Sequence, residues 1–391
     1  MSEITLADAA RRARVTPATL RRWAKEGLIP QYDGEWTLAA AAHARIVARL
    51  RERGHTLEEI RRASEGGVLA FAYVEDLFPP VEPAYTIEEA AQESGLERAL
   101  IERIWASIGF NAQSLERLTE EDLQLLHYVA AVLSAGFPLV AFLQLVRVYG
   151  QAMSQVADAE VRLFHLYVHE PLMRDGVPGL EMAEEMEDLA RELLPLASPM
   201  MDHVHQRFLQ HFLEQDVIGH MESDVDEDTL ELGRLRVAIA FADLAGYTRL
   251  TEEEGEEQAL GAVERFVDAV ENTLPDDARV VKTIGDEVMV VGSDPAGLTD
   301  WAVGFQTLVD ERPLPRVGIH YGETLYRDGD YYGREVNLAA RVAARAAGGE
   351  VLVTRPVVDN AGQHLEFEPI GEVRLKGFRD PTELFLARTA E

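Results

Sequence analysis

Two aspartates stand where a carboxylate could hold a cation beside a phosphate. Asp243 directly follows the apolar run 237–242, which predicts a buried strand, and Gly246 then allows a turn into a helix. Asp286 lies at the tip of a predicted hairpin whose strands cover 278–282 and 288–291. Two such carboxylates from neighbouring strands could bind two divalent ions on a triphosphate. The pattern therefore predicts metal-dependent phosphate chemistry.

Four segments around these residues resemble the class III adenylyl and guanylyl cyclases in order and approximate spacing. They are FADLAGYT at 241–248, VKTIGDE at 281–287, GDYYGREVNLAARV at 329–342 and LKGF at 375–378. Each segment alone is weak evidence, whereas the whole set in order is specific. The resemblance implies an α/β ferredoxin-like cyclase domain. An inactive relative of the family is the alternative.

The resemblance also implies roles for individual residues. Asp243 and Asp286 would hold two Mg²⁺ or Mn²⁺ ions per active site, which activate the ribose 3′-hydroxyl and bind the leaving pyrophosphate. Asn337 and Arg341, four residues apart on one predicted helical face, would orient the ribose and stabilise the transition state. In the family the metal ligands come from one subunit and these residues from its partner. The implied active form is a head-to-tail homodimer with two sites.

The remaining matched positions concern the nucleotide. Lys282 and Asp330 match the pair that reads the base, and Lys376 matches a lysine that contacts the terminal phosphates. Adenine presents an acceptor at N1 and a donor at its amino group, and guanine presents the reverse pattern. Because a lysine donates and an aspartate accepts, this pair favours adenine. We therefore expect an adenylate cyclase, a phosphorus–oxygen lyase that converts ATP to 3′,5′-cyclic AMP and pyrophosphate.

The first 63 residues differ in charge from the rest of the chain. They hold 12 Lys and Arg against 8 Asp and Glu, whereas the whole chain has a net charge of −32. Thr16 followed by Pro17 predicts a second short helix after a tight turn, and residues 33–36 predict a wing. With TLRRWAKEGLI at 19–29 and RLRERGHTLEEI at 49–60, this order resembles the MerR-type winged helix-turn-helix.

In that family the second helix enters the major groove of DNA. The resemblance therefore implies that Arg21, Arg22 and Lys25 would contact the groove and the phosphates. The alternative is a helix-turn-helix kept only for packing or regulation, because a fold does not fix its function.

The same unit occurs a second time in a degenerate form. The segment TIEEAA at 86–91 repeats TLADAA at 5–10. Five further residues return 82 positions later, namely Trp23, Gly27, Thr37, Gly54 and Leu57 as Trp105, Gly109, Thr119, Gly136 and Leu139. Residues 85–149 contain 4 basic and 9 acidic residues, which DNA phosphates would repel. We expect this copy to serve packing or dimerisation.

The middle of the chain is predicted to be helical and is rich in histidine. Seven of the eleven histidines lie between 127 and 220, and His165 and His169 fall one helical turn apart. Three interpretations stay open, namely a cluster that titrates near neutrality and moves a helical transmitter, a metal site, and amphipathic helices with polar edges.

The predicted chain is multidomain, with an all-α N-terminal region followed by the α/β domain. Its parts are a MerR-like unit (1–66), a linker (67–84), a second MerR-like unit (85–150), a helical regulatory region (151–220), an acidic linker (221–233) and the cyclase domain (234–391). The chain has no cysteine, which suits a reducing cytoplasm, and no apolar run long enough to span a membrane.

Two rival functions use the same segments differently. One is a DNA-binding transcription regulator whose degenerate cyclase domain serves as a nucleotide sensor or dimerisation module. The other is an enzyme whose MerR-like region inhibits it and never touches DNA. The complete set of Asp243, Asp286, Asn337 and Arg341 favours the enzyme over the pure sensor.

Overall fold

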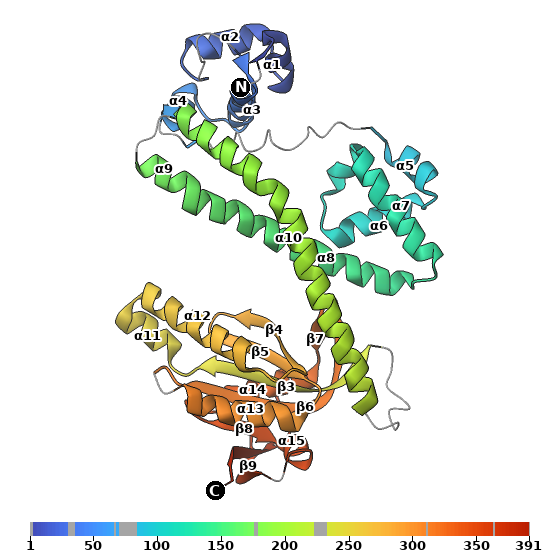
Figure 1. The fold of residues 1–391 in the computed structure, drawn as a ribbon, viewed down its shortest axis with the longest axis vertical. Helices are drawn as coiled ribbons and strands as arrows, with labels where there is room; N and C mark the ends of the chain where they lie inside the picture. The colour runs from blue at the N-terminus through green and yellow to red at the C-terminus, as the bar shows by residue number, and fades with distance from the viewer. Residues whose placement is uncertain are drawn as a thin grey trace. The chain divides into compact units, whose positions relative to one another are not determined.

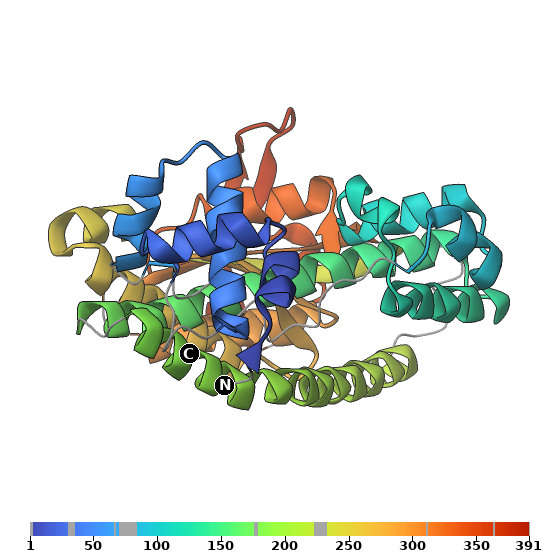
Figure 2. The same cartoon turned by 90° about the horizontal axis from the view of Figure 1, so that it is seen from above.

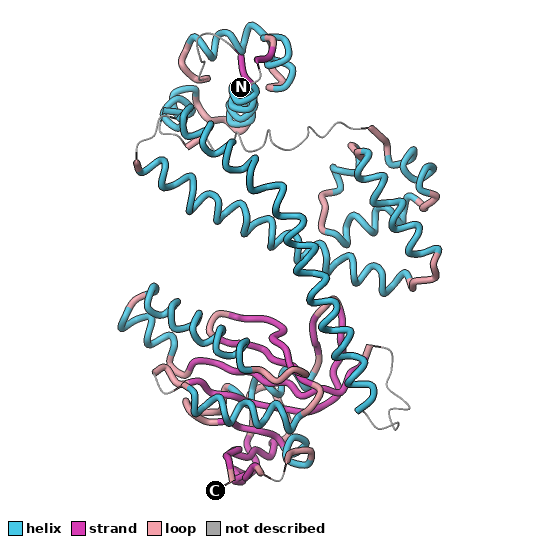
Figure 3. The backbone as a smooth tube through the Cα atoms, viewed as in Figure 1, coloured by secondary structure: helices cyan, strands magenta, loops and turns pink. Residues whose placement is uncertain are grey.

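A computed structural model describes residues 3–29, 36–65, 68–69, 84–175, 179–222, 233–309, 312–362 and 364–390. The chain divides into two compact units, Met1–Arg207 and Phe208–Glu391. Strands gather in the second unit, whereas the first is almost wholly helical (Figure 3). This arrangement confirms the predicted fold class. Most of the two predicted linkers, and the predicted wing apart from Trp36, lie outside the described residues.

The first MerR-like unit forms the predicted helices in the predicted order. Its elements are β1 (Glu3–Ile4), α1 (Leu6–Arg12), α2 (Pro17–Lys25), β2 (Trp36–Thr37), α3 (Leu38–Glu52) and α4 (Leu57–Glu65). The Thr16 hydroxyl caps α2 by accepting a hydrogen bond from the Thr19 amide at 3.1 Å. Leu20 and Trp23 of α2 are buried against α1 and α3 residues. The helix-turn-helix is therefore fixed by one cap and one apolar face.

One buried histidine makes the stability of this unit depend on pH. Burial among apolar side chains lowers the pKa of His43 to about 4 from its usual 6.5. Between these two values the unfolded chain binds a proton that the folded unit does not. Stability should therefore fall by at most about 3 kcal/mol as the pH drops from 6.5 to 4. Urea unfolding at pH 7.5 and 5 should show part of this loss, about 2 kcal/mol, in the parent chain.

A matched variant isolates the contribution of this one histidine. His43→Gln can still reach the Ser64 hydroxyl, which lies 3.1 Å from the His43 Nε2 atom, and it does not titrate. Between pH 7.5 and 5, the free energy of unfolding of this variant should fall less than that of the parent. An equal loss in both proteins would contradict the assignment.

The second copy of the repeat also forms a succession of four helices, with a 3₁₀ turn in place of the short strand β2. They are α5 (Ile87–Ser94), α6 (Arg98–Ile108), the 3₁₀ turn η2 (Ala112–Glu116), α7 (Glu120–Ser134) and α8 (Leu139–Phe164). Trp105 is buried as Trp23 is. The repeated glycines that end helices have positive φ in both copies, at 70° and 95° for Gly27 and Gly109. The sequence repeat is therefore also a structural repeat.

Helices continue from the second copy of the repeat into the compact unit Phe208–Glu391. The π-helical turn η3 (His165–His169) and α9 (Glu170–Arg174) follow α8, and α10 covers Gly179–Glu222. Helix α10 is one continuous run of 44 residues that contains Pro195 and Pro199. Its ribbon is coloured green to yellow-green in Figure 2. Each proline removes one backbone hydrogen bond from the helix. In the part of the chain that the structure describes, no helix combines the length and apolarity needed to cross a membrane.

The second unit is built on one mixed sheet (Figure 1). Its strands are β3 (Arg234–Leu244), β4 (Ala278–Ile284), β5 (Glu287–Gly292), β6 (Pro315–Arg327), β7 (Asp330–Tyr332), β8 (Val351–Thr354), β9 (Leu365–Val373) and β10 (Thr382–Thr389). Its helices are α11 (Tyr247–Glu254), α12 (Glu256–Thr273), α13 (Pro295–Leu308), α14 (Arg334–Ala343) and α15 (Arg355–Asp359). The sheet order is β4-β5-β3-β6-β8-β10-β9, with β7 beside β6. The succession β-α-β-β-α-β from β3 to β6 is the ferredoxin-like arrangement that we predicted.

The two faces of β3 pack against different helices. Ala240 and its alternate neighbours join the core that includes Phe266 of α12 and Phe305 of α13. Ile239 and its alternate neighbours join a smaller core with Ala339 of α14. A strand that is buried on both faces has a continuous apolar sequence, and this run predicted β3.

Candidate active site

Asp243 lies at the end of the central strand β3, where it is 8% exposed. In the sheet it stands opposite Glu287 of β5 and Arg316 of β6. The strand ends at Leu244, and Gly246, with a φ of 92°, leads into α11. The carboxylate therefore stands at a strand end beside a glycine turn, as the sequence pattern predicts.

Asp286 forms the tip of the β4–β5 hairpin and reaches Asp243. Gly285 has a φ of 66°, a left-handed conformation that allows this tight turn. Burial, followed by a hydrogen bond to Asp243 and repulsion from its charge, raises the pKa of Asp286 to about 6. The structure therefore brings the two predicted metal ligands close enough to interact.

A third charged residue completes this cluster, and sequence analysis did not identify it. The Arg316 guanidinium donates from Nε to the Asp243 carboxylate at 2.7 Å and makes a second bond from Nη2 to the same oxygen. Arg316 is the second residue of β6 and lies 73 positions from Asp243, so no local pattern joins them. Its positive charge beside two carboxylates could also hold an anionic phosphate.

These residues fit a small divalent cation that binds together with a substrate. Mg²⁺ is usually held by one or two carboxylates, with water and phosphate oxygens as the other ligands. Asp243 and Asp286 supply two interacting carboxylates. Among the described residues, no group of three or more His, Cys, Asp or Glu side chains is arranged to hold a metal. This donor set suits a metal that arrives with a triphosphate.

Lys282 and Asp330, the predicted base-reading pair, contact each other. Lys282 Nζ donates to Asp330 Oδ2, and the two side chains are 37% and 23% exposed. Lys282 belongs to β4 and Asp330 begins β7, so the pair joins two strands that are not neighbours in the sheet. A donor and an acceptor are thus held side by side at a partly open position.

Asn337 and Arg341 lie one turn apart on α14, and both side chains are exposed. The opposite face of α14, with Leu338 and Val342, is buried. Gly318 of β6 permits this helix to pack closely, because a Cβ atom there would lie 2.0 Å from the Ala343 amide nitrogen. The sheet therefore presents the amide and the guanidinium to solvent on one helical face.

A buried histidine links this helix to the sheet. His320 of β6 is 4% exposed, and its Nδ1 lies 2.8 Å from the Thr354 hydroxyl. Its Nε2 lies 2.6 Å from Oε2 of Glu335, in the first turn of α14. Burial lowers the pKa of His320, although Glu335 opposes this effect. These contacts give His320 a packing role between the sheet and α14.

The other predicted residues are exposed. Lys376 follows the buried Leu375 in the turn between β9 and β10. In the first MerR-like unit, the exposed side of α2 carries Arg21, Arg22 and Lys25.

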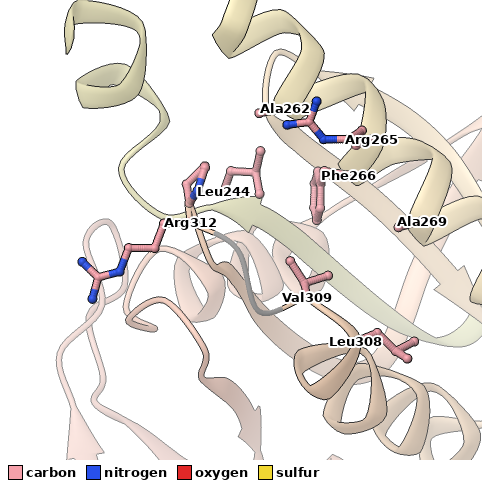
Figure 4. A pocket seen from close by; sticks show the side chains of 9 residues that line it. Leu244, Ala262, Arg265, Phe266, Ala269, Leu308, Val309 and Arg312 are labelled. Atoms are coloured by element: carbon pink, nitrogen blue, oxygen red, sulfur yellow. The ribbon is translucent and has the colours of Figure 1, made fainter. Parts of the chain in front are cut away.

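A pocket of about 190 Å³ opens beside the same end of β3 (Figure 4). Leu244, which follows Asp243, lines it together with Phe266 of α12 and Leu308 of α13. None of the described residues that line it belongs to the predicted site. The pocket is therefore separate from the carboxylates and from the Lys282–Asp330 pair.

Comparison with known families finds three matches in the chain. Residues 234–388 match the adenylate and guanylate cyclase catalytic domain, and residues 25–213 match the adenylate cyclase regulatory domain. Residues 5–35 match the MerR family regulatory protein. The chain belongs to the adenylate and guanylate cyclase family, which confirms the resemblance seen in the sequence.

Several relatives resemble most of the chain. An adenylate cyclase of Streptomyces coelicolor is 31% identical over 290 residues, which are 72% of this chain and 72% of that protein. A pH-sensitive adenylate cyclase of Mycobacterium tuberculosis is 29% identical over 368 residues, which are 90% and 89% of the two chains. The adenylyl cyclase CyaB from P. aeruginosa aligns with 41% of this chain and 98% of its own, at 21% identity and a TM-score of 0.38.

Proposed function

We propose that this protein is an adenylate cyclase that converts ATP to 3′,5′-cyclic AMP and pyrophosphate with two divalent ions at a homodimer interface. The observation that carries the choice of ATP is the contact between Lys282 and Asp330. A lysine donor and an aspartate acceptor at one position complement N1 and the amino group of adenine. Relatives named adenylate cyclase support the same substrate.

The chain's own residues divide the work of this reaction. Bound Mg²⁺ or Mn²⁺ would supply a Lewis acid that lowers the pKa of the ribose 3′-hydroxyl. Asp243 and Asp286 would hold the metal, and Arg316 would stand beside the phosphates. Asn337 would orient the ribose. Arg341 would neutralise charge on the α-phosphoryl group in the transition state.

Parallel assays of cyclic AMP and cyclic GMP formation test this function. The full-length protein with Mn²⁺ should form cyclic AMP from ATP at a higher kcat/KM than cyclic GMP from GTP. A preference for GTP would overturn the choice of base. No cyclic nucleotide from either substrate would overturn the enzymatic function and favour the rival reading as a sensor.

Reversing the base-reading pair should reverse part of the substrate preference. In Lys282→Glu with Asp330→Cys, the first position accepts and no longer donates. We expect the ratio of kcat/KM for ATP over GTP to fall by about 10- to 100-fold, equivalent to about 1–3 kcal/mol. Assays of both nucleotides at equal metal concentration measure this ratio. An unchanged ratio would show that other residues read the base.

We also propose that residues 1–220 regulate the cyclase, supported by the match of residues 25–213 to a regulatory domain. DNA binding by the first MerR-like unit stays a prediction. It is motivated by the exposed side of α2, which carries Arg21, Arg22 and Lys25. If it occurs, binding to duplex DNA should weaken steeply with salt, and Arg21→Ala with Arg22→Ala should reduce both affinity and salt slope. Gel shifts over a range of salt concentrations measure this. Absence of salt-sensitive binding would leave a purely regulatory helix-turn-helix.

A further inference from the structure

Arg279, at the start of β4, is held between two aromatic rings of the second unit. Its guanidinium carbon lies 5.4 Å from the centre of the Phe212 ring and 5.7 Å from the centre of the Tyr331 ring. Its Nη2 also donates to the Tyr331 hydroxyl at 2.8 Å. These distances fall within the range in which a cation is attracted to a ring face. Arg279 therefore has two partners from two different elements.

One of these partners connects Arg279 to the regulatory part of the chain. Phe212 belongs to α10 and to residues 25–213, which match the regulatory domain. The same residue lies within the compact unit Phe208–Glu391, so its contact with Arg279 is internal to that unit. The end of the regulatory segment thus packs on a strand of the catalytic sheet.

The other partner connects Arg279 to the base-reading pair. Tyr331 is 4% exposed and follows Asp330, and its amide donates to Asp330 Oδ1 at 2.8 Å. Lys282 follows Arg279 by three residues on β4. Strands β4 and β7 are not neighbours in the sheet, because β4 pairs with β5 and β7 with β6. Side chains join them at two places, Lys282–Asp330 and Arg279–Tyr331.

The backbone between these two links is irregular. The pairing of β4 with β5 shifts register between Val280 and Lys282. Such a bulge leaves a residue unpaired and changes the direction of nearby side chains. Val281 is the residue left out of the pairing, and Lys282 pairs with Met289 directly beyond the bulge. The Arg279–Tyr331 bond lies on the other side of the bulge and is a second side-chain link between β4 and β7.

We propose that Arg279 is a positioning residue for base recognition, and that Phe212 of α10 holds it in place. The proposal rests on the function proposed above and names the contact through which the regulatory segment reaches that site. When Phe212 packs on Arg279, the guanidinium stays on Tyr331, and Asp330 stays opposite Lys282. When Phe212 withdraws, the pair loses its alignment, and the protein discriminates less well between adenine and guanine.

Five full-length proteins besides the parent test this proposal. Arg279→Met removes the charge and the hydrogen bond but keeps an unbranched side chain. Phe212→Leu removes the ring face but keeps apolar volume, and Phe212→Trp keeps a ring. A double variant combines Arg279→Met with Phe212→Leu. Arg249→Met is the matched control, because Arg249 belongs to the same unit and pairs with Glu253 on the exposed face of α11.

The readout is kcat and KM for ATP and for GTP with Mn²⁺. For Arg279→Met we expect KM for ATP to rise about 10-fold and the ATP-over-GTP preference to fall, with a smaller effect on kcat. Phe212→Leu should shift the same two quantities about 2- to 5-fold, and Phe212→Trp should restore them. The double variant should resemble Arg279→Met, because both residues act through one contact. Arg249→Met should match the parent.

Three results would overturn the proposal. One is an unchanged ATP-over-GTP preference in Arg279→Met. Another is a loss of kcat in that variant with KM and preference unchanged, because a merely structural role would give the same result. The third is additive effects of the two substitutions, which would mean that Phe212 acts elsewhere. A parent protein that forms no cyclic nucleotide would instead refute the proposed function, so the two failures are distinguishable.

Discussion

Asp286→Asn should lower the rate of cyclic nucleotide formation at least about 100-fold while the protein stays folded. Asparagine has nearly the same shape as aspartate, so the tip of the β4–β5 hairpin keeps its turn. It has no negative charge, so a divalent ion loses one of its two protein carboxylates. Asp286 is a sharper probe than Asp243, because Asp243 balances the charge of Arg316 inside the sheet. Removing one partner of such a buried pair costs about 3–5 kcal/mol and would confuse catalysis with folding.

Two measurements separate metal binding from a general loss of structure. Mn²⁺ binding in the presence of a non-reactive ATP analogue, followed by electron paramagnetic resonance, should weaken in Asp286→Asn. Asp268→Asn is the matched control, because Asp268 is an exposed aspartate on α12 of the same unit, and it should behave as the parent does. Near-normal activity of Asp286→Asn would contradict the two-carboxylate metal site.

A mixture of two inactive variants should recover about one quarter of the parent activity. Asp286→Asn damages the metal half of a site, and Arg341→Met damages the transition-state half. If each site takes one half from each subunit, every heterodimer contains one intact site and one doubly damaged site. Random exchange at equal concentrations makes about half of the dimers heterodimers, and each of these has one working site of two.

A second mixture controls for a general effect of mixing. Arg341→Met and Asn337→Ala both damage the same half, so their heterodimers should stay inactive. Activity is measured after subunit exchange, and heterodimers are counted with a tag on one partner. If tagged heterodimers of the first mixture form and remain as inactive as the single variants, the shared-site arrangement is wrong.

Local sequence patterns predicted the parts of the site that depend on one strand or one helix. Asp243 could be found because β3 is buried on both faces, so its apolar run 237–242 stops at the first carboxylate. Asp286 could be found because a Gly-Asp turn separates two short apolar runs. Asn337 and Arg341 could be found because their spacing places them on one helical face. In these cases the spacing of apolar and polar residues along a single strand or helix is enough to place the residue.

Residues that depend on strand pairing could not be found in this way. Arg316 meets Asp243 only because β6 lies antiparallel to β3, in a register that brings together residues 73 positions apart. Arg279 looks in the sequence like any arginine in a strand. Its relation to Tyr331 depends on two strands that are not neighbours in the sheet. Pairing and register are tertiary properties, and the pattern of a single strand does not contain them.

The two copies of the N-terminal repeat share residues that fix their helices and differ in surface charge. Each copy retains the threonine that starts its first helix, the tryptophan in its core and the glycines that end its helices. The solvent-facing residues, by contrast, have exchanged basic for acidic side chains. A change of surface charge costs little folding free energy, whereas a change at a cap or in the core costs much more. Two similarly built helical units can thus carry opposite net charge within a single chain, so the electrostatic field that each presents to solvent differs in sign.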